Sequence, residues 1–529
     1  MRHKDNKIKQ KIILAITASV MTISVVAQTP VKQPTLVVGI VINGLRSDYI
    51  DLMRNHFGEN GFNRILNNGA IIENVEYGNN IDATAATAML FSGASTSVNG
   101  ISSKTVYDID KKQPHPVLLD PTKIGNYTDE TYSPSALLVS TISDEIRING
   151  GGIGYVYSIA PDAQQSIIMA GHAGNSAFWI NDITGKWATT TFYKDVPTTI
   201  QSRNLSKPLS SRLDTLSWTP SMSLDNYPYL PEYKRHYPFR HTFSRSDKNR
   251  YKAYKESAPV NTEVTSVATD YIKTISLGKR GVMDMLNISY TVVPYSYTRD
   301  GDNRVELMDS YIKLDAELSN LFNAIDRNVG LNNTLIFIAG TPAPMRTRRD
   351  DEKWNIPSGE FSSKKAISLL NMYLMAIYGN GNWVNGIHNK QIYLNHKLIT
   401  ERNKDIKEIR NNAADFVARM SGISQVYTID QILLGQAGKQ LRKNTHISHA
   451  GDLFLTIAPG WEIIENDGSN EIRSISHAQA TSSPVFIMAP TIKAQCITYP
   501  TSALDIAPTI ARILRIRSPN AAENTPLSL

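Results

Sequence analysis

The stretch Thr35-Leu-Val-Val-Gly-Ile-Val-Ile42, followed by Asn43-Gly-Leu-Arg-Ser-Asp-Tyr-Ile50, decides the fold class. Its first half is an unbroken apolar run. Such a run is typical of a strand buried on both faces in a parallel sheet, because a strand with one solvated face alternates apolar and polar residues. Its second half turns into a helical pattern, and a strand that leads directly into a helix is the unit of layered α/β proteins.

The same alternation of apolar runs and helical periodicity continues along the chain. The apolar runs predict buried strands at Gly154–Ile159, Met285–Val293, Leu335–Ala339 and Pro484–Met488. Helical patterns lie between them, at Ala136–Ile148, Glu263–Ser276, Val305–Val329, Ser362–Tyr373 and Ala413–Ser421. We therefore expect an α/β layered sandwich with a central, largely parallel sheet flanked by helices.

The N-terminus has the pattern of a secretory signal. A basic segment from Arg2 to Lys11 precedes the apolar run Ile12–Val26, and Val25-Val26-Ala27 is a small-residue cleavage pattern. The run is shorter than the roughly 20 residues of a spanning helix, so cleavage after Ala27 is expected rather than a membrane anchor. No later segment is apolar enough to span a bilayer. The prediction is a periplasmic or otherwise exported protein, with residues 1–27 as signal peptide.

Composition excludes several classes of protein. The chain has 529 residues, of which 41% are hydrophobic and 19% charged, as in ordinary soluble proteins. Removing residues 1–27 takes away five Lys and Arg and one Asp, which lowers the formal net charge from +7 to +3. The remaining charge does not suggest nucleic-acid binding. Cys496 is the only cysteine, which excludes an internal disulfide framework and a cysteine-based zinc site.

Composition also changes along the chain. Residues from about Thr184 to Val260 are rich in Pro, Ser, Tyr, Arg and Lys and have weak periodicity, which predicts a long cap-like insertion over one end of the sheet. We expect two parts of one core, residues 28–183 and 261–529, on either side of the insertion at 184–260. A smaller insertion with hairpin turns is expected at about residues 379–403.

Several segments, taken in order, resemble the alkaline phosphatase superfamily, and most of all the secreted, phosphate-irrepressible alkaline phosphatases of Bacteroidota. The resemblance extends nearly end to end, from Leu36 to Leu529. It is carried by the segments Val37–Tyr49, Phe91–Ser95, Asn99–Ile101, Ala170–Trp179, Gly185–Trp187, Asp309–Leu318 and Asp505–Leu514. It implies a site with two zinc ions, one of which activates a Thr or Ser nucleophile while the other stabilises the leaving oxygen of a phosphoryl transfer. Such a site needs Asp and His ligands at fixed places.

None of the six ligand positions implied by the resemblance carries Asp or His. Asn43 stands where the family has an Asp after the first strand. The family's Asp-x-x-x-His becomes Pro294 and Thr298, and its Asp-His pair becomes Gly340 and Thr341. The last His, which precedes the final buried strand, is replaced by Ser482. Neutral side chains are poor zinc ligands beside carboxylates, so we expect no zinc and no other cofactor.

The resemblance places the nucleophile at Thr84 in Asp82-Ala-Thr-Ala-Ala-Thr-Ala, with Thr87 as the alternative. Without a metal, a threonine there is also explained as a helix cap. The family's substrate clamp, a Lys-x-Arg pair, becomes Asp162 and Gln164, and its phosphate-contacting Asn falls near Lys104. Thr84 is therefore a vestigial nucleophile with nothing predicted to activate it.

The remaining histidine and acidic clusters are better explained without a metal. His172 lies in a glycine-flanked turn and is expected to pack structurally. His446 and His449 have a spacing that can bind metal on a helix, but a solvated loop is expected there, and His477 lies further along the same third of the chain. The acidic run Asp350–Glu352 is expected to be a solvated loop.

Three functions follow from these patterns. The first is a pseudoenzyme that has kept the fold and acts by binding or scaffolding in the cell envelope, with an envelope protein as its partner. The second is an active hydrolase of phosphate, phosphonate or sulfate esters, of alkaline phosphatase or phosphodiesterase type, with Thr84 and a rebuilt metal site. The third is an exported binding protein that uses its Tyr-rich insertion as a contact surface and merges with the first. The coordinated replacement of ligands and clamp favours the first.

Overall fold

The computed structural model describes residues 33–194, 196–298, 301–342, 358–467, 470–476 and 483–529. The predicted signal segment, residues 1–27, lies outside them. The chain divides into Met1–Gln33 and Pro34–Leu529, and the fold described below belongs to the second part. No helix within the described residues is long and apolar enough to cross a membrane.

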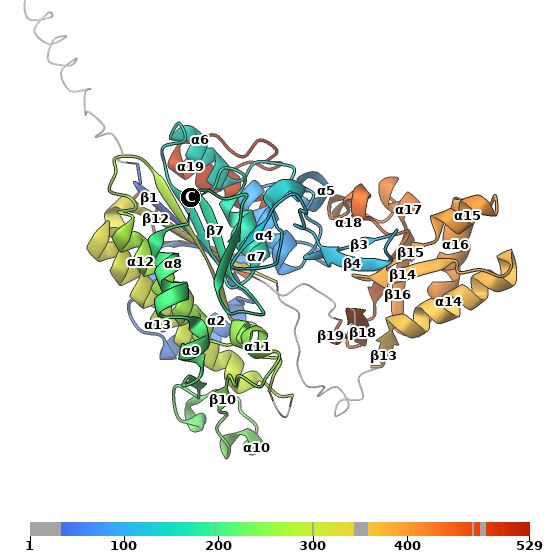
Figure 1. The fold of residues 1–529 in the computed structure, drawn as a ribbon, viewed down its shortest axis with the longest axis horizontal. Coiled ribbons are helices and arrows are strands. Elements are labelled where there is room, and N and C mark those ends of the chain that lie inside the picture. Colours follow the sequence, from blue (N-terminus) through green and yellow to red (C-terminus); the bar gives the residue numbers. More distant parts are fainter. Residues whose placement is uncertain (1–32, 195, 299–300, 343–357, 468–469, 477–482) are drawn as a thin grey trace, which may run out of the picture. The chain divides into compact units, whose positions relative to one another are not determined.

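A large sheet forms the centre of the fold (Figure 1). Its strands, in spatial order, are β21 (Gln495–Ile497), β2 (Ala70–Glu76), β20 (Ser483–Met488), β12 (Thr334–Thr341), β1 (Leu36–Asn43), β11 (Asp284–Thr291), β6 (Val156–Ile159), β7 (Ser176–Ile180), β8 (Trp187–Thr190) and β5 (Gly125–Asn126). The five strands from β12 to β7 are parallel to one another. The predicted α/β fold with a largely parallel sheet is confirmed.

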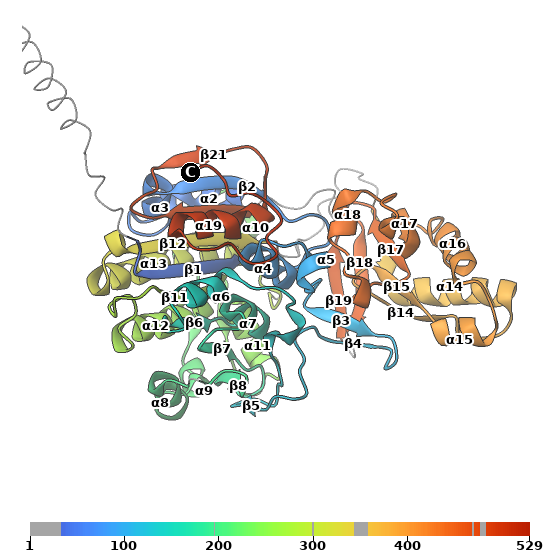
Figure 2. The same ribbon diagram turned by 90° about the horizontal axis from the view of Figure 1, so that it is seen from above.

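Helices cover both faces of this sheet, as Figure 2 shows. Side chains of β1 alternate between two cores: Val38, Ile40 and Ile42 belong to one, and Val37 and Val41 to the other. The first core is closed by α2 (Ser47–Met53), α3 (Phe62–Asn68), α12 (Pro259–Thr274) and α13 (Arg304–Asn328). The second is closed by α4 (Ala83–Ser92), α6 (Ile142–Asn149) and α19 (Ile506–Leu514). Burial on both sides explains the unbroken apolar run.

Two elements differ from the sequence-based prediction. β20 is buried as expected, but it runs antiparallel to both β12 and β2, a direction that an apolar run does not reveal. The helix predicted from Ala136 begins only at Ile142, because Thr141 ends the preceding segment as an N-cap. Its hydroxyl accepts a hydrogen bond from the backbone amide of Asp144, whose carboxylate accepts one in return from the amide of Thr141.

The 184–260 region contains short helices and a two-stranded sheet. They are α8 (Thr198–Ser206), α9 (Leu209–Leu213), β9 (Ser217–Trp218), α10 (Glu232–Arg235), β10 (His241–Thr242) and α11 (Arg250–Glu256). Ile200, Leu213 and Tyr227 are buried in the same core as β1. A buried carboxylate on α13 also holds the region: Asp309 accepts hydrogen bonds from Trp218 Nε1 at 2.6 Å, from the Tyr227 hydroxyl at 2.8 Å and from the Ser221 amide at 2.7 Å.

Residues 360–475 form sheets and a core of their own. The strands are β13 (Glu360–Ser362), β14 (Val384–His388), β15 (Gln391–Leu394), β16 (Ile423–Thr428), β17 (Leu453–Ile457), β18 (Glu462–Asp467) and β19 (Asn470–Ile475). Helices α14 (Ser363–Tyr378) and α16 (Ile406–Val417) pack on them through Leu370, Ile409 and Val417. The stretch 379–403, where the smaller insertion was expected, supplies β14, β15 and α15 (His396–Glu401) to this larger unit.

Candidate functional site

Three strand ends meet at one edge of the central sheet. Asn43, the last residue of β1, pairs in register with Thr291 at the end of β11 and with Thr341 at the end of β12. The carboxyl ends of parallel strands are where open α/β sheets bind ligands. The sheet thus brings two of the positions that the resemblance assigned to metal ligands, Asn43 and Thr341, side by side.

The side chains of these two residues bond to each other. The Thr341 hydroxyl donates a hydrogen bond of 3.0 Å to Asn43 Oδ1. Thr341 is fully buried and Asn43 is only 9% exposed. The amide oxygen that a metal would need is therefore engaged by a neutral donor, and neither group brings the negative charge that a zinc ion favours.

Gly340, the third of these positions, leaves no room for a side chain. A Cβ placed on it would lie 2.9 Å from the backbone oxygen of Leu45 and 3.3 Å from Cδ of Pro484. Its carbonyl accepts a hydrogen bond from the Tyr77 hydroxyl. Contacts this short with backbone are not relieved by turning a side chain, so this strand end is packed around a glycine.

The start of α4 holds the candidate nucleophile. Asp82 caps the helix: its carboxylate accepts hydrogen bonds from the Ala85 amide at 2.9 Å and from the Lys104 amide at 2.6 Å. Thr84 is 2% exposed, and its hydroxyl makes no hydrogen bond with the described residues. The Thr87 hydroxyl, in contrast, donates to the Ala83 carbonyl at 2.6 Å. Of the two threonines, only Thr84 keeps an uncommitted hydroxyl.

Pro294 and Thr298 follow β11. Pro294 is buried and offers no metal-binding atom in its side chain. The Thr298 hydroxyl lies 3.1 Å from Oε1 of Glu306, and Nε2 of His241 lies 3.0 Å from the same oxygen. Glu306 is 1% exposed, and its other oxygen has no hydrogen-bond partner. The 184–260 region thus supplies a histidine, paired with a buried carboxylate, which sequence reasoning missed because the two residues are 65 positions apart.

At the first of the two positions that the resemblance assigns to the clamp, the structure has a carboxylate in place of a cation. Asp162, directly before α7 (Ala163–Ala170), forms an ion pair of 2.8 Å with Lys255, which also lies 2.5 Å from Asp182. Burial opposes the charged form of Asp162, but Lys255 and Lys104 outweigh it and lower the pKa of that carboxyl. Gln164, the second residue of α7, is buried. Lys255 was not predicted, since only folding brings α11 beside the strand end at Ile180.

Three histidines singled out in the sequence, His172, His446 and His449, lie within the described residues. Nε2 of His172 lies 2.8 Å from the Leu137 carbonyl, and Nδ1 lies 3.4 Å from the Asp144 carboxylate, which agrees with a structural role. The rings of His446 and His449 stack at 5.6 Å in a short 3₁₀ turn, and burial lowers the pKa of both. Within the described residues no group of three or more His, Cys, Asp or Glu could hold a metal ion. Ser482, His477 and the run 350–352 lie outside those residues.

Comparison with known proteins gives the family. Residues 37–481 match the Type I phosphodiesterase / nucleotide pyrophosphatase family. The chain belongs to this family. It is 25% identical to alkaline phosphatase PafA of Elizabethkingia meningoseptica, over 94% of each chain, and 26% identical to a protein of Myroides odoratus named calcium-transporting ATPase, over 95% of this chain and 96% of that one. The resemblance to the alkaline phosphatase superfamily is confirmed.

A solved structure supports the same assignment at the level of the fold. The crystal structure of wild-type PafA superposes with a TM-score of 0.82, at 24% identity, and covers 94% of this chain and 99% of that one. This similarity extends over both the sheet and the 360–475 segment, because nearly the whole of each chain is covered. A family member nevertheless takes its chemistry from its site and not from its fold.

Two zinc ions, which the family resemblance implies, do not fit the residues present at the described positions. Asn43 and Thr341 are neutral and bonded to each other, and Gly340 has no space for a carboxylate. Thr298 is committed to Glu306. Among the described residues, this arrangement therefore offers a packed strand edge and, at the start of α4, the unbonded hydroxyl of Thr84, which is a weak nucleophile unless a base or a metal activates it.

Proposed function

We propose that this protein is a member of its family that has lost the two-zinc centre and acts by binding, as a scaffolding or ligand-binding protein of the cell envelope. The observation that carries the proposal is the packing at the carboxyl ends of β1 and β12. The Asn43–Thr341 hydrogen bond and the packing of Leu45 and Pro484 against Gly340 occupy the space of three metal-ligand positions. A phosphoryl transfer of the two-metal kind has no support from these residues.

The charge at the clamp positions supports the same proposal. A clamp that holds a phosphate group needs cations, as Lys and Arg supply. Here Asp162 brings a carboxylate, and the nearby Lys255 is already shared between Asp162 and Asp182. The ammonium group of Lys255 is therefore engaged by carboxylates of the protein itself and is not free to bind a phosphate.

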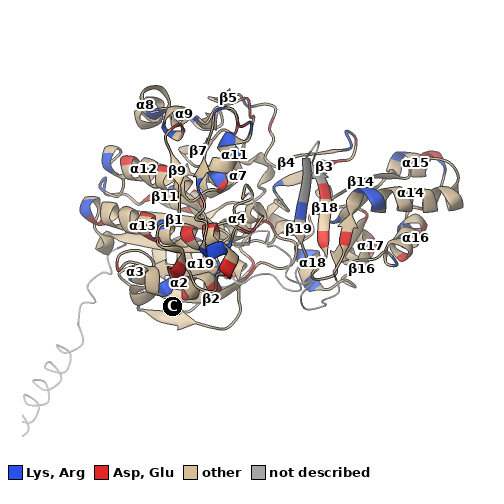
Figure 3. Cartoon of the chain, turned by 90° about the horizontal axis from the view of Figure 1, so that it is seen from below, with Lys and Arg blue, Asp and Glu red and all other residues tan. Residues whose placement is uncertain are grey.

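Export to the periplasm or beyond is part of the proposal and is supported by the signal pattern of residues 1–27. Nucleic acid is not an expected partner. In Figure 3 Lys and Arg are interspersed with Asp and Glu, whereas proteins that bind nucleic acid gather their cations on one face. An envelope protein remains the proposed kind of partner, and its identity calls for a pull-down from envelope extracts.

The alternative function is an active phosphoric ester hydrolase. One observation favours it: Thr84 lies in the first turn of α4 with an uncommitted hydroxyl, the kind of place where a nucleophile can stand. The homologue PafA is named an alkaline phosphatase. A metal bound by residues outside the described ranges would be needed to activate the hydroxyl.

Turnover of a generic aryl phosphate ester separates the two functions. The purified chain, at high enzyme concentration and with added zinc, should release no more product than its Thr84→Ala variant. Ser103→Ala is the control: it deletes a buried hydroxyl on the loop after residues 96–99, outside α4. Turnover that vanishes in Thr84→Ala but persists in Ser103→Ala would establish the hydrolase and contradict the proposal.

A further inference from the structure

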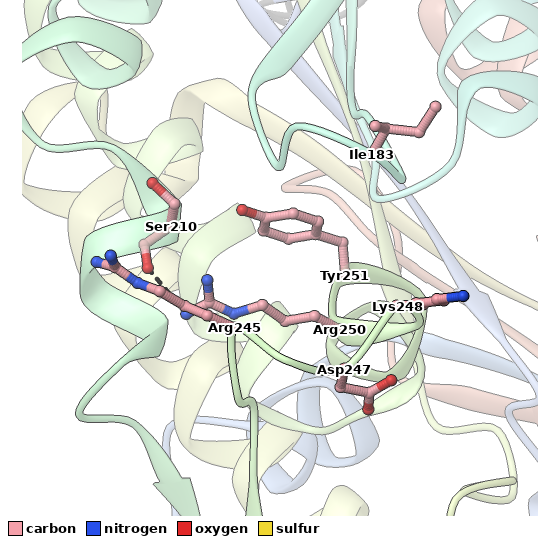
Figure 4. A pocket seen from close by; sticks show the side chains of 7 residues that line it. All are labelled: Ile183, Ser210, Arg245, Asp247, Lys248, Arg250 and Tyr251. Atoms are coloured by element: carbon pink, nitrogen blue, oxygen red, sulfur yellow. Dashed lines mark hydrogen bonds between the residues drawn. The ribbon is translucent and has the colours of Figure 1, made fainter.

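A polar pocket of about 470 Å³ lies among residues 183–251 (Figure 4). Its walls come from α9, from the loop after β10 and from the start of α11, with Ile183 of the β7–β8 turn on the other side. The volume is within the ordinary range for small-molecule sites. None of its lining residues belongs to the positions discussed above, so the pocket is independent of the proposed function.

Arg250 forms the fixed floor of this pocket. It is only 5% exposed, and its Nε donates to the Phe243 carbonyl at 2.9 Å. Its Nη2 donates to the Ser210 carbonyl at 2.9 Å and to Asp214 at 2.6 Å. A guanidinium held by backbone carbonyls is already oriented before any ligand arrives, which lowers the entropic cost of binding.

The pocket carries an excess of positive charge. Arg245 and Arg250 share a single carboxylate, Asp214, and the hydrogen bond from Arg245 is the main cause that lowers the pKa of Asp214. Lys248 adds a third cation, and Asp247 a second carboxylate. Three cations against two carboxylates leave one net positive charge, so a ligand with one negative group balances the pocket.

Tyr251 supplies a flat wall whose position is set by the backbone behind it. A Cβ placed on Gly185, which has φ +67°, would lie 2.1 Å from Cε1 of Tyr251, so the ring rests directly on that glycine. The ring centroid lies 5.6 Å from the Arg250 guanidinium carbon. A fixed aromatic face beside an oriented cation suits a ligand with a compact organic body and an anionic group.

We propose that this pocket binds a small organic oxyanion, namely a carboxylate or phosphate carried on a sugar-sized body. The oxyanion pairs with the guanidinium groups of Arg245 and Arg250, and the body rests on the Tyr251 ring. Guanidinium forks match both carboxylate and phosphate, so these two sources of negative charge share one recognition chemistry.

Calorimetric titration of the full chain tests the proposal with four probes: glucuronate, glucose 6-phosphate, glucose and inorganic phosphate. We expect saturable binding of glucuronate, of glucose 6-phosphate or of both, and about tenfold weaker binding of glucose, because the charge-assisted hydrogen bonds are lost. Tighter binding of glucuronate would identify a carboxylate as the preferred anionic group, and tighter binding of glucose 6-phosphate would identify a phosphate. Binding of neither anion, or equal binding of glucose, would overturn the proposal, and so would tighter binding of inorganic phosphate alone.

Two substitutions locate the binding in this pocket. Arg245→Gln removes a cation whose side chain is 71% exposed, so the fold should persist, and we expect affinity to fall about tenfold. Lys252→Gln removes an exposed cation from the same helix as Arg250 that does not line the pocket, and it should leave affinity unchanged. Equal losses in both variants would show non-specific attraction and reject the site. Zinc content and ester turnover play no part in this test.

Discussion

Lys255 joins two carboxylates at the position that the resemblance assigns to the clamp. Its side chain is 10% exposed and pairs with Asp162 and Asp182, and these two carboxylates raise the pKa of Lys255 although burial alone would lower it. Removing the ammonium leaves two carboxylates facing each other in a partly buried place. A buried ion that loses its partner costs more than the intact pair contributes.

We therefore predict that Lys255→Met lowers the free energy of unfolding by about 1–3 kcal/mol, as measured by urea denaturation. The double variant Lys255→Met with Asp162→Asn should recover part of this loss, because one of the repelling charges is gone. If the double variant is as unstable as the sum of its two single variants, the residues do not interact as the structure shows.

A substitution at Gly340 tests how tightly the end of β12 is packed. We predict that Gly340→Ala destabilises the protein by about 1–3 kcal/mol, because its Cβ would meet the Leu45 backbone and there is no flexible side chain to give way. Gly150→Ala is the matched control: Gly150 has φ −81°, and its Cβ would find the nearest atoms at an ordinary 3.6 Å. Similar unfolding midpoints for the two variants would contradict the tight packing around Gly340.

His172 gives the stability a pH dependence. The hydrogen bond to Asp144 raises its pKa from 6.5 in spite of burial, so the pair stabilises the fold fully below that ordinary pKa. The contribution is lost as pH rises through the raised pKa of the folded state. We expect the stability difference between wild type and His172→Gln to be larger at about pH 6 than at about pH 8.5. A stability difference between wild type and His172→Gln that does not change between these two pH values would refute the assignment.

Among the elements, α13 holds the 184–260 region to the core. Asp309 is fully buried and accepts three hydrogen bonds, from Trp218, Ser221 and Tyr227. Both Trp218 and Tyr227 lie between residues 217 and 243, where helices and strands are short. Short elements contribute little cooperative stability of their own, so the anchor decides how often this segment opens.

We predict that Asp309→Asn speeds proteolysis between residues 217 and 243 several-fold and lowers stability by about 2–4 kcal/mol, because the amide would add a donor group of its own where three donors already converge. Trp218→Phe removes one donor and keeps the apolar bulk, and it should have a smaller effect. Limited proteolysis followed by mass spectrometry measures the site and rate of cleavage. Unchanged cleavage in Asp309→Asn would show that the apolar contacts hold the insertion without the anchor.

The elements that could be predicted from the sequence are those whose signal is local. β1, β11 and β12 are buried on both faces, so their apolar runs give their positions within one or two residues. Direction is not a local property, and the antiparallel course of β20 was not predictable from its composition. The 360–475 core was also missed, since Leu370, Val417 and Leu455 meet only after folding.

For the molecule as a whole, the sequence predicts the scaffold better than it predicts the contacts within the site. The scaffold was recognisable because its segments keep their order from β1 to α19, and the family match spans residues 37–481. From the sequence, the site could be predicted only as six positions whose residues differ from the metal ligands that the resemblance implies. Its actual contacts, such as Asn43 with Thr341 or Lys255 with Asp162, join residues far apart in the chain and arise from the fold.

We propose above that this phosphatase-like scaffold has lost its two-zinc centre. Zinc stoichiometry tests it most directly: the purified chain is dialysed against a small excess of zinc, then against metal-free buffer, and its bound zinc is measured by mass spectrometry. We predict well below one zinc per chain, because Asn43, Gly340 and Thr341 offer neither charge nor space. About two zinc ions per chain that survive dialysis would contradict the account.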